Sequence, residues 1–142
     1  MSSLQAALGL AELEEIDNFL FRKKQITNLY NKLLQGINSL ELPHDVPGSK
    51  SINWQYSIIV KKEAKLNRDK LAELLSKNKI ETRNFVIPLH KQPAFIKIGL
   101  FNNSKYPISE YLAANGLSIP SGLAIKDSEI KFVSKVIRNA LL

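Results

Sequence analysis

The sequence contains no cysteine, and this absence removes several classes of chemistry at once. Disulfides, zinc–thiolate sites, iron–sulfur clusters and thiol nucleophiles all need cysteine side chains, so none is available to this chain. Histidine is almost as scarce, with only His44 and His90. They do not have the helical spacing of a pair of metal ligands, so no metal site is predicted. We expect His44 to be a solvated loop residue.

Motifs that would define other classes are missing too. The six glycines are dispersed, and neither G-x-G-x-x-G nor G-K-[ST] occurs, so no phosphate-binding loop is predicted. No serine-nucleophile motif accompanies either histidine. No apolar run approaches the roughly 20 residues of a membrane span, and the N-terminus does not resemble a signal peptide. We therefore expect a cytoplasmic chain with no membrane partner.

What is present is a globular composition with a basic excess. The 142 residues are 44% hydrophobic and 23% charged, which suits one domain, or two small ones, with a real core. The net charge is +7, but the lysines and arginines are scattered along the chain. A dispersed excess favours weak attraction to anions such as a phosphate-bearing small ligand. Nucleic acid is a minor alternative, and we predict no nucleic-acid partner.

Residues 2–37 have the pattern of one long amphipathic helix. Ser2 and Gln5 have the spacing of a capping box, and apolar residues then recur at separations of three, four and five. The register slips at residues 22–25, where we expect a bend or a rotation of the buried face. A continuous helix would be about 50 Å long, at ~1.5 Å per residue. Its first turns, residues 4–11, are nearly all small or apolar, so we expect another body or subunit to cover them.

The rest of the chain alternates strand and helix patterns. Residues 54–60 are rich in aromatic and β-branched side chains and predict a strand. Asn67 is the expected N-cap of a helix to Lys77, with Asn78 in the left-handed conformation after it. The next predicted elements are a strand at 80–83 and a turn involving Gly99, Asn102 and Asn103. A helix at 106–115, with Ile108, Tyr111 and Leu112 inward, and a strand at 117–119 follow. The last predicted helix runs to residue 142, is capped by Asp127 or Ser128, and buries Ile130, Val133, Ile137 and Leu141. This order predicts an α+β fold with helices against a small, mostly antiparallel sheet.

Residues 81–95 combine backbone restriction with mixed chemistry. Two prolines five positions apart argue against both a helix and a central strand, so a short strand is expected to break into a loop. A rigid loop of this kind can form the wall of a small-molecule site. The alternative is a plain connector in which the imidazole caps a backbone group. The residues concerned are Arg83, Phe85, Pro88, His90, Gln92, Pro93 and Phe95.

Three segments together resemble a known family. They are residues 1–17 (MSSLQAALGLAELEEID), the run Glu81-Thr82-Arg83 followed by Pro88-Leu89-His90 and Gln92-Pro93, and residues 116–122 (GLSIPSG) before a last helix. In order and spacing they are similar to the C-terminal part of DegT family sugar aminotransferases, pyridoxal-phosphate enzymes that aminate keto sugars on nucleotide diphosphates. The resemblance implies the small domain of a fold-type I aminotransferase. Residues 1–38 would be a connecting helix, and residues 39–142 a small α+β domain.

The same resemblance implies which parts of the chemistry this chain carries. In the family, the Schiff-base lysine, the acid that pairs with the pyridinium nitrogen and most cofactor contacts precede the position equivalent to Met1. We therefore expect no catalytic residue here, no pyridoxal phosphate bound by this chain alone, and no activity alone. Arg83 and His90 would line the sugar-nucleotide pocket, Gln92 would be a neighbouring hydrogen bonder, and Trp54 and Phe85 aromatic walls. Trp54 and Phe85 could instead be core residues, and Gln92 a loop brace.

Two functions of different classes remain open. The first is the sugar-nucleotide-binding part of an aminotransferase. The second is a non-catalytic interaction module, in which the apolar first turns of the long helix associate with another copy or with a partner chain carrying the large domain. The sugar, the nucleotide and the amino donor cannot be read from these residues.

Overall fold

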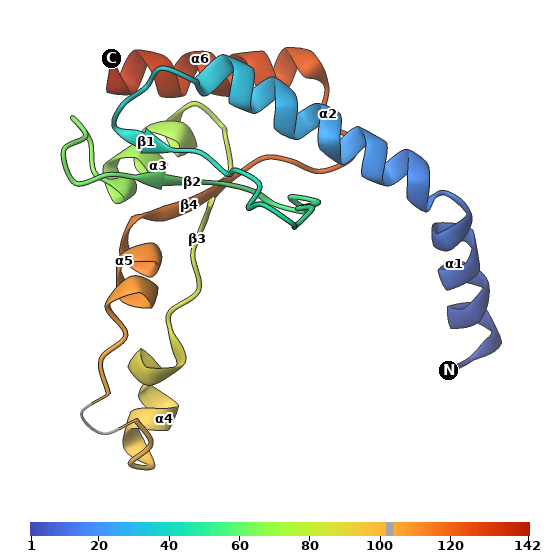
Figure 1. Ribbon diagram of the computed structural model, residues 1–142, viewed down its shortest axis with the longest axis horizontal. Helices are drawn as coiled ribbons and strands as arrows, with labels where there is room; N and C mark the ends of the chain where they lie inside the picture. The colour runs from blue at the N-terminus through green and yellow to red at the C-terminus, as the bar shows by residue number, and fades with distance from the viewer. Residues whose placement is uncertain (102–103) are drawn as a thin grey trace.

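The computed structural model describes residues 1–101 and 104–142 and shows a compact body with two projections (Figure 1). The elements, in chain order, are α1 (Ser3–Glu14), α2 (Ile16–Leu34), β1 (Leu40–Glu41), β2 (Tyr56–Val60), α3 (Arg68–Lys77), β3 (Arg83–Asn84), the 3₁₀ helix η1 (Leu89–Lys91), α4 (Pro93–Lys97), α5 (Pro107–Asn115), β4 (Gly116–Ile119) and α6 (Asp127–Leu141). This arrangement confirms the predicted α+β class.

The sheet has the strand order β1-β2-β4-β3, and each neighbouring pair is antiparallel. In β2, alternate residues Tyr56, Ile58 and Val60 are buried. Leu117 and Ile119 of β4 continue that face, because Leu117 pairs with Ile58 and Ile119 with Tyr56. Successive strand side chains point to opposite faces. The intervening residues therefore lie on the other face of the sheet.

The buried face is covered by α2, α3 and α6, which together with the sheet enclose the core. The core residues of α6 are those predicted from its helical spacing, and they pack mainly against α2. Each fully buried aliphatic side chain contributes about 1.5–3 kcal/mol relative to exposure. The buried residues of this core cluster are Ile26, Tyr30, Leu34, Ile37, Leu40, Tyr56, Ile58, Val60, Leu71, Leu75, Ile80, Leu117, Ile119, Ile130, Val133, Ile137 and Leu141.

Two stacked tyrosines join α2 to the sheet. The rings of Tyr30 and Tyr56 lie 4.6 Å apart. The Tyr30 hydroxyl donates to the Pro120 carbonyl at 2.7 Å, and the Tyr56 hydroxyl donates to Asn31 Oδ1 at 2.6 Å. Burial raises the pKa of both hydroxyls. Both tyrosines therefore combine full burial with a satisfied polar atom, as buried hydroxyls require.

The long N-terminal helix is broken at Glu15, not bent at residues 22–25 as predicted. Glu15 leaves the helical region at φ −99° and ψ 4°, and its side chain accepts a hydrogen bond from the Asn18 amide. The basic run stays helical because it is where α2 first bonds to the body: Arg22 pairs with Asp127 and Lys23 donates to two carbonyls. The predicted capping box of Ser2 and Gln5 is confirmed.

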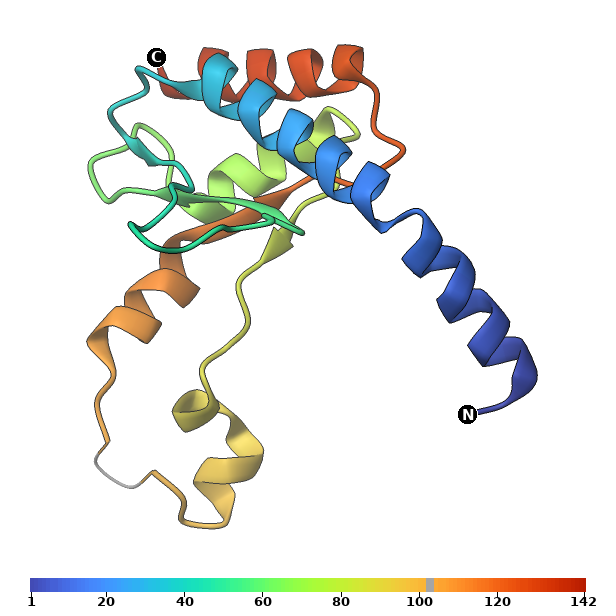
Figure 2. The same cartoon turned by 45° about the vertical axis from the view of Figure 1, so that its right-hand side comes forward.

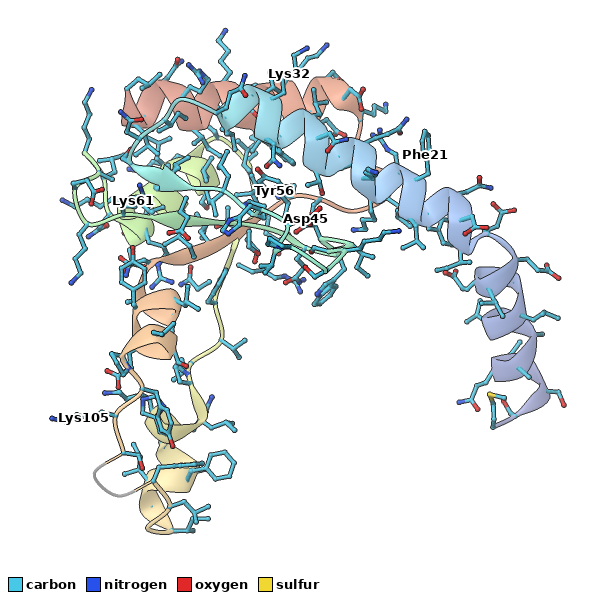
Figure 3. All side chains as sticks on the ribbon, viewed as in Figure 1. Phe21, Lys32, Asp45, Tyr56, Lys61 and Lys105 are labelled. Atoms are coloured by element: carbon cyan, nitrogen blue, oxygen red, sulfur yellow. The ribbon has the colours of Figure 1, made fainter. Side chains whose placement is uncertain are left out.

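No residue of α1 is buried. Its leucines are more than half exposed, from 58% at Leu10 to 80% at Leu4, and the apolar surface continues onto α2 at Phe21. Phe21 points away from the body (Figure 3). The helix projects from one side of the molecule (Figure 2), as expected for a segment that needs a further surface to cover it.

The second projection is the segment between β3 and β4, which we call the arm (described residues 85–101 and 104–115). It includes η1, α4 and α5. The prolines do not exclude helices here as predicted, because Pro93 is the first residue of α4, where its missing N–H costs no hydrogen bond. Ile108 and Leu112 of α5 are 75% and 37% exposed rather than inward, since α5 stands away from the core. In the predicted turn, Gly99 has φ 77°, and Asn102 and Asn103 lie outside the described residues.

Several predicted boundaries shift for identifiable reasons. Strand β2 begins at Tyr56 rather than residue 54, because the next partner on β4 would be Pro120, which has no N–H to donate. Strand β3 is Arg83–Asn84, and Ile80 instead joins the core. The left-handed residue after α3 is Lys79 (φ 60°), not Asn78. The Ile80 N–H reaches the Leu75 carbonyl, as in a Schellman motif.

The last helix also begins differently from the prediction. Lys126 is its N-cap, and the Glu129 carboxylate accepts from the Lys126 N–H at 2.7 Å. Asp127 is the first helical residue, so neither it nor Ser128 is the cap. Over the described ranges, no helix combines the length and apolarity needed to cross a membrane. The division of the chain at residue 38 remains a prediction.

We expect Tyr30→Phe to lower the free energy of unfolding by about 1 kcal/mol, because the Pro120 carbonyl loses its partner. Tyr111→Phe is the matched control, since Tyr111 is half-buried on the arm and its hydroxyl forms no hydrogen bond with the described part of the chain. Urea denaturation measures both. Equal stabilities of the two variants would show that the buried hydroxyl contributes nothing.

Candidate functional site

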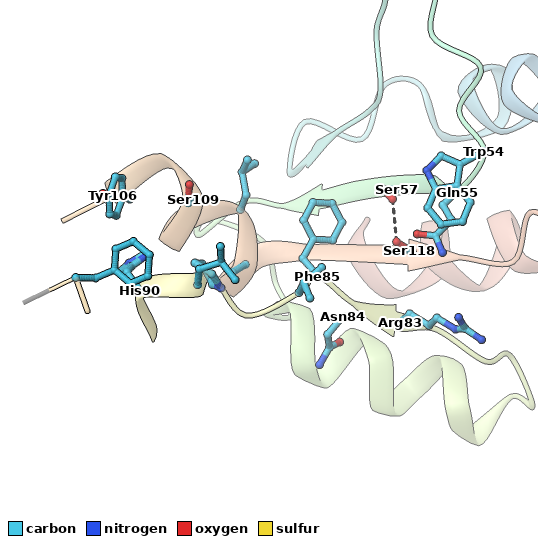
Figure 4. Close-up of a pocket in the computed structure, with 16 residues that line it drawn as sticks. Trp54, Gln55, Ser57, Arg83, Asn84, Phe85, His90, Tyr106, Ser109 and Ser118 are labelled. Carbon is cyan, nitrogen blue, oxygen red and sulfur yellow. Dashed lines mark hydrogen bonds between the residues drawn. The ribbon is translucent and has the colours of Figure 1, made fainter. Parts of the chain in front are cut away.

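A groove of about 790 Å³ lies on the sheet face opposite the helices and extends along the arm (Figure 4). Its floor is formed by Ser57 and Ser118, whose side chains point away from the core. The strand register places them opposite each other, and their Oγ atoms are 2.8 Å apart. Small hydroxyl side chains keep this part of the sheet open to a ligand.

Phe85 lies between the two ends of the groove, directly over Gly116. A Cβ atom at Gly116 would lie 2.4 Å from Phe85 Cγ and 2.6 Å from the Leu112 carbonyl oxygen. Contacts this short are not tolerated, so only glycine lets the ring rest on the first residue of β4. Phe85 is therefore a wall of the groove rather than a residue of the main core.

One end of the groove is polar and carries Arg83, Trp54, Gln55 and Asn84. Among the described residues, no hydrogen bond or ion pair engages the Arg83 guanidinium. Its five N–H donors match carboxylate or phosphate oxygens. Trp54 is 68% exposed, which rules out the core alternative for this residue. The Trp54 indole and the Arg83 guanidinium both lie beside the floor of the groove. This end is therefore suited to a ligand that carries both an aromatic ring and a negative charge.

The other end lies on the arm, where His90 contacts Glu110 and Tyr106. His90 Nε2 is 2.9 Å from Glu110 Oε1, and the Lys91 ammonium is 3.3 Å from Glu110 Oε2. An ionised carboxylate can only accept, so Nε2 carries the proton. The ring of Tyr106 packs against the imidazole at 4.8 Å. The hydrogen bond from His90 holds the pKa of the Glu110 carboxyl below its usual value.

The structure brings together four of the five residues predicted for binding: Trp54, Arg83, Phe85 and His90 all line the groove. Gln92 does not line it. Its Nε2 donates to the Ile87 carbonyl at 3.0 Å, which is the brace considered as its alternative. Binding roles for all five remain predictions.

Other lining residues were missed from the sequence. Ser57 and Ser118 could have been found from strand alternation, which places them opposite the buried residues. Leu112 was predicted to face the core and instead faces the groove. Gln55 and Ser109 carry no sequence signal that separates them from ordinary surface residues.

The fold is found in solved structures of aminotransferases. The structure superimposes on that of a putative sugar aminotransferase from Streptococcus pneumoniae with a TM-score of 0.88 at 22% identity, over 99% of this chain and 35% of that one. An aminotransferase from Brucella abortus gives a TM-score of 0.82 at 26% identity, over 98% of this chain and 35% of that one. The first of these likenesses shows the fold alone.

The sequence identifies the family. A profile of the DegT/DnrJ/EryC1/StrS aminotransferase family matches residues 1–138, and the chain belongs to this family. It is 30% identical to GDP-perosamine synthase of Vibrio cholerae over 98% of this chain, and 31% identical to that of Escherichia coli O157:H7 over 96%. The chain spans only 37% and 35% of the lengths of these relatives.

The residues of the groove do not fit covalently held pyridoxal phosphate, the cofactor of this family. Such a site needs a lysine for the Schiff base and an acidic partner for the pyridinium nitrogen. Of the described residues that line the groove, none is a lysine, an aspartate or a glutamate. The groove offers a guanidinium, an imidazole, hydroxyls and aromatic rings, which are groups for binding rather than for anchoring this cofactor.

We expect His90→Phe to raise the pKa of Glu110 toward its ordinary value, because the ring N–H that stabilises the carboxylate is gone. Because the pKa of Glu110 is depressed in the folded state, its contact with His90 stabilises the fold at pH values above the pKa of an unperturbed carboxyl. This stabilisation is lost as the pH falls through the folded-state pKa. Carboxyl ¹³C shifts followed against pH measure this change. His90→Gln, which keeps an N–H donor, should retain part of the depression; an unchanged Glu110 pKa in both variants would contradict the role of His90.

Proposed function

We propose that this chain forms the nucleotide-sugar-binding part of a pyridoxal-phosphate-dependent aminotransferase that aminates a keto sugar carried on a nucleoside diphosphate. Its relatives support the substrate class, since their names include GDP-perosamine synthase and a dTDP-4-amino-4,6-dideoxy-D-glucose transaminase at 29% identity. The observation that carries the proposal is the groove, with the free Arg83 guanidinium and exposed Trp54 at one end.

The chemistry of the two ends fits the two parts of such a ligand. A diphosphate matches the planar donors of Arg83, and the exposed Trp54 indole can stack on a nucleobase. The sugar would extend over Ser57, Ser118 and Phe85 toward His90. Hydroxyl and imidazole groups along this path can hydrogen-bond sugar hydroxyls, and the apolar walls exclude water.

The cofactor belongs to a different part of the assembly in this proposal. The lysine and acid that pyridoxal phosphate needs are not supplied by the groove, so they come from the region that makes up the remaining length of the relatives. That region stands either in the same polypeptide or in a partner chain. Without it, the residues described here bind substrate and do not catalyse. A cytoplasmic location, compatible with the lack of cysteine, is part of the same proposal.

The direct test is titration of the chain with GDP and with dTDP. Binding is monitored by the fluorescence of Trp54, the single tryptophan. Arg83→Gln should weaken binding about tenfold or more, because a charged hydrogen bond contributes roughly 1.5–3 kcal/mol. Lys77→Gln is the control, since it removes the same charge from the exposed end of α3. Equal losses of affinity in both variants would show that Arg83 acts only through its positive charge. No binding by the unaltered chain would refute the proposal.

A second candidate function is assembly, which the bare surface of α1 supports. Leu4, Leu8, Leu10 and Leu13 are each more than half exposed, and Phe21 extends the surface onto α2. Contiguous apolar patches of this kind mark interaction sites. The partner would be the large domain in the same or another polypeptide, or a second copy of this chain.

We expect the chain to self-associate, and Leu4→Gln/Leu8→Gln to weaken this association more than tenfold. Each buried leucine contributes about 1.5–3 kcal/mol, and glutamine keeps the helix propensity of the site. Sedimentation equilibrium measures the change, with Phe132→Gln, on the half-exposed face of α6, as control. A clean monomer at high concentration would count against assembly through α1.

A further inference from the structure

We propose that Lys23 of α2 is a positioning residue of the groove: its ammonium ties the backbone of Trp54 to the turn after β4 and so fixes the indole at the polar end. The inference rests on the proposed function for its ligand, but the placement of Trp54 can be tested without one.

The geometry is a bridge between two segments distant in sequence. Lys23 Nζ donates to the Trp54 carbonyl and to the Ser121 carbonyl, each at 2.7 Å. Charge-assisted hydrogen bonds are stronger than neutral ones. Two of them from one ammonium cross-link the loop before β2 with the chain leaving β4. Lys23 thus reaches the edge of the groove from the helix layer.

Neighbouring bonds hold the same turn, so the bridge has a rigid anchor. The Tyr56 N–H donates to Ser121 Oγ at 2.9 Å, and the Tyr30 hydroxyl donates to the Pro120 carbonyl. Ser121 is 8% exposed. The turn is therefore fixed to both β2 and α2. By contrast, Trp54 lies in a loop outside β2, and Lys23 is the side chain that bonds its backbone.

The bridge also shapes a second hollow beside the groove. This hollow, of about 360 Å³, is bounded by Lys23 and Ser121 and shares Trp54, Gln55, Arg83 and Ser118 with the groove. Partial burial lowers the pKa of Lys23, and the two carbonyls compensate for the loss of water around the charge. The ammonium is thus occupied in positioning, whereas the Arg83 guanidinium remains free for a ligand.

The experiment compares Lys23→Met, which removes the donors but keeps the chain length, with Lys23→Arg, which can still reach both carbonyls. Lys24→Met is the neighbouring control, because Lys24 is exposed and makes no hydrogen bond among those described. Ile137→Val is a second control, which loses about 0.5–1.5 kcal/mol of stability without touching the bridge. The readouts are acrylamide quenching and fluorescence anisotropy of Trp54, and affinity for GDP.

We expect Lys23→Met to raise the quenching of Trp54 about twofold, lower its anisotropy, and weaken GDP binding about tenfold, equivalent to about 1.4 kcal/mol. Lys23→Arg should restore most of each value, and both controls should match the unaltered chain. If Lys23→Met does not fold, Lys23→Gln, too short to span both carbonyls, replaces it with the same expectation.

Unchanged quenching and anisotropy in the folded Lys23 variant would overturn the inference, as would an equal change in Ile137→Val. Failure of the unaltered chain to bind GDP would instead refute the proposed function. In that case, the quenching and anisotropy of Trp54 still decide whether Lys23 positions it.

Discussion

The division of the sheet into two unlike faces underlies the whole structure. Tyr56, Ile58 and Val60 of β2 face the core, and the antiparallel register aligns Ser57 with Ser118 on the face without helices. Because side chains alternate strictly along a strand, a slip of one residue would bury the serines and expose the core. The same register thus sets both the hydrophobic core and the floor of the groove, so the fold and the candidate site cannot vary independently.

Helix α2 serves both faces of this arrangement. Its apolar stripe at Ile26, Tyr30 and Leu34 packs into the core, while Lys23 reaches the backbone at Trp54, just before β2 begins. A second cation of the helix layer, Arg138 of α6, also donates to backbone carbonyls, those of Leu33 and Gln35 at the end of α2. Lys23 and Arg138 therefore have structural roles. Arg83 differs from these cations because it faces the groove and, within residues 1–101 and 104–142, has no hydrogen-bond or ion-pair partner.

Where local spacing and core packing agree, the sequence predicts the structure well. The stripe of α6 and the Asn67 cap of α3 are confirmed because each is specified by the spacing of residues within one helix. The predictions fail where the outcome depends on distant partners. Trp54 lies outside the strand because Pro120, distant in sequence, cannot pair with its neighbour, and Leu112 turns to the groove because α5 belongs to the arm. No local pattern marks the Lys23 bridge, which joins segments 31 and 98 residues away.

The energetics of α1 link the two candidate functions. A helix of 12 residues is near the length at which isolated helices are marginal in water. Its capping box contributes about 1 kcal/mol, and it gains nothing from burial because no residue of α1 is buried. A surface that covers its leucines would therefore stabilise the helix as well as bind it. Since α1 leads directly into α2, a body docked on α1 would contact the helical segment whose Lys23 bonds the Trp54 carbonyl beside the groove. Assembly through α1 and ligand binding in the groove would then both involve the segment formed by α1 and α2, so the two candidate functions are compatible.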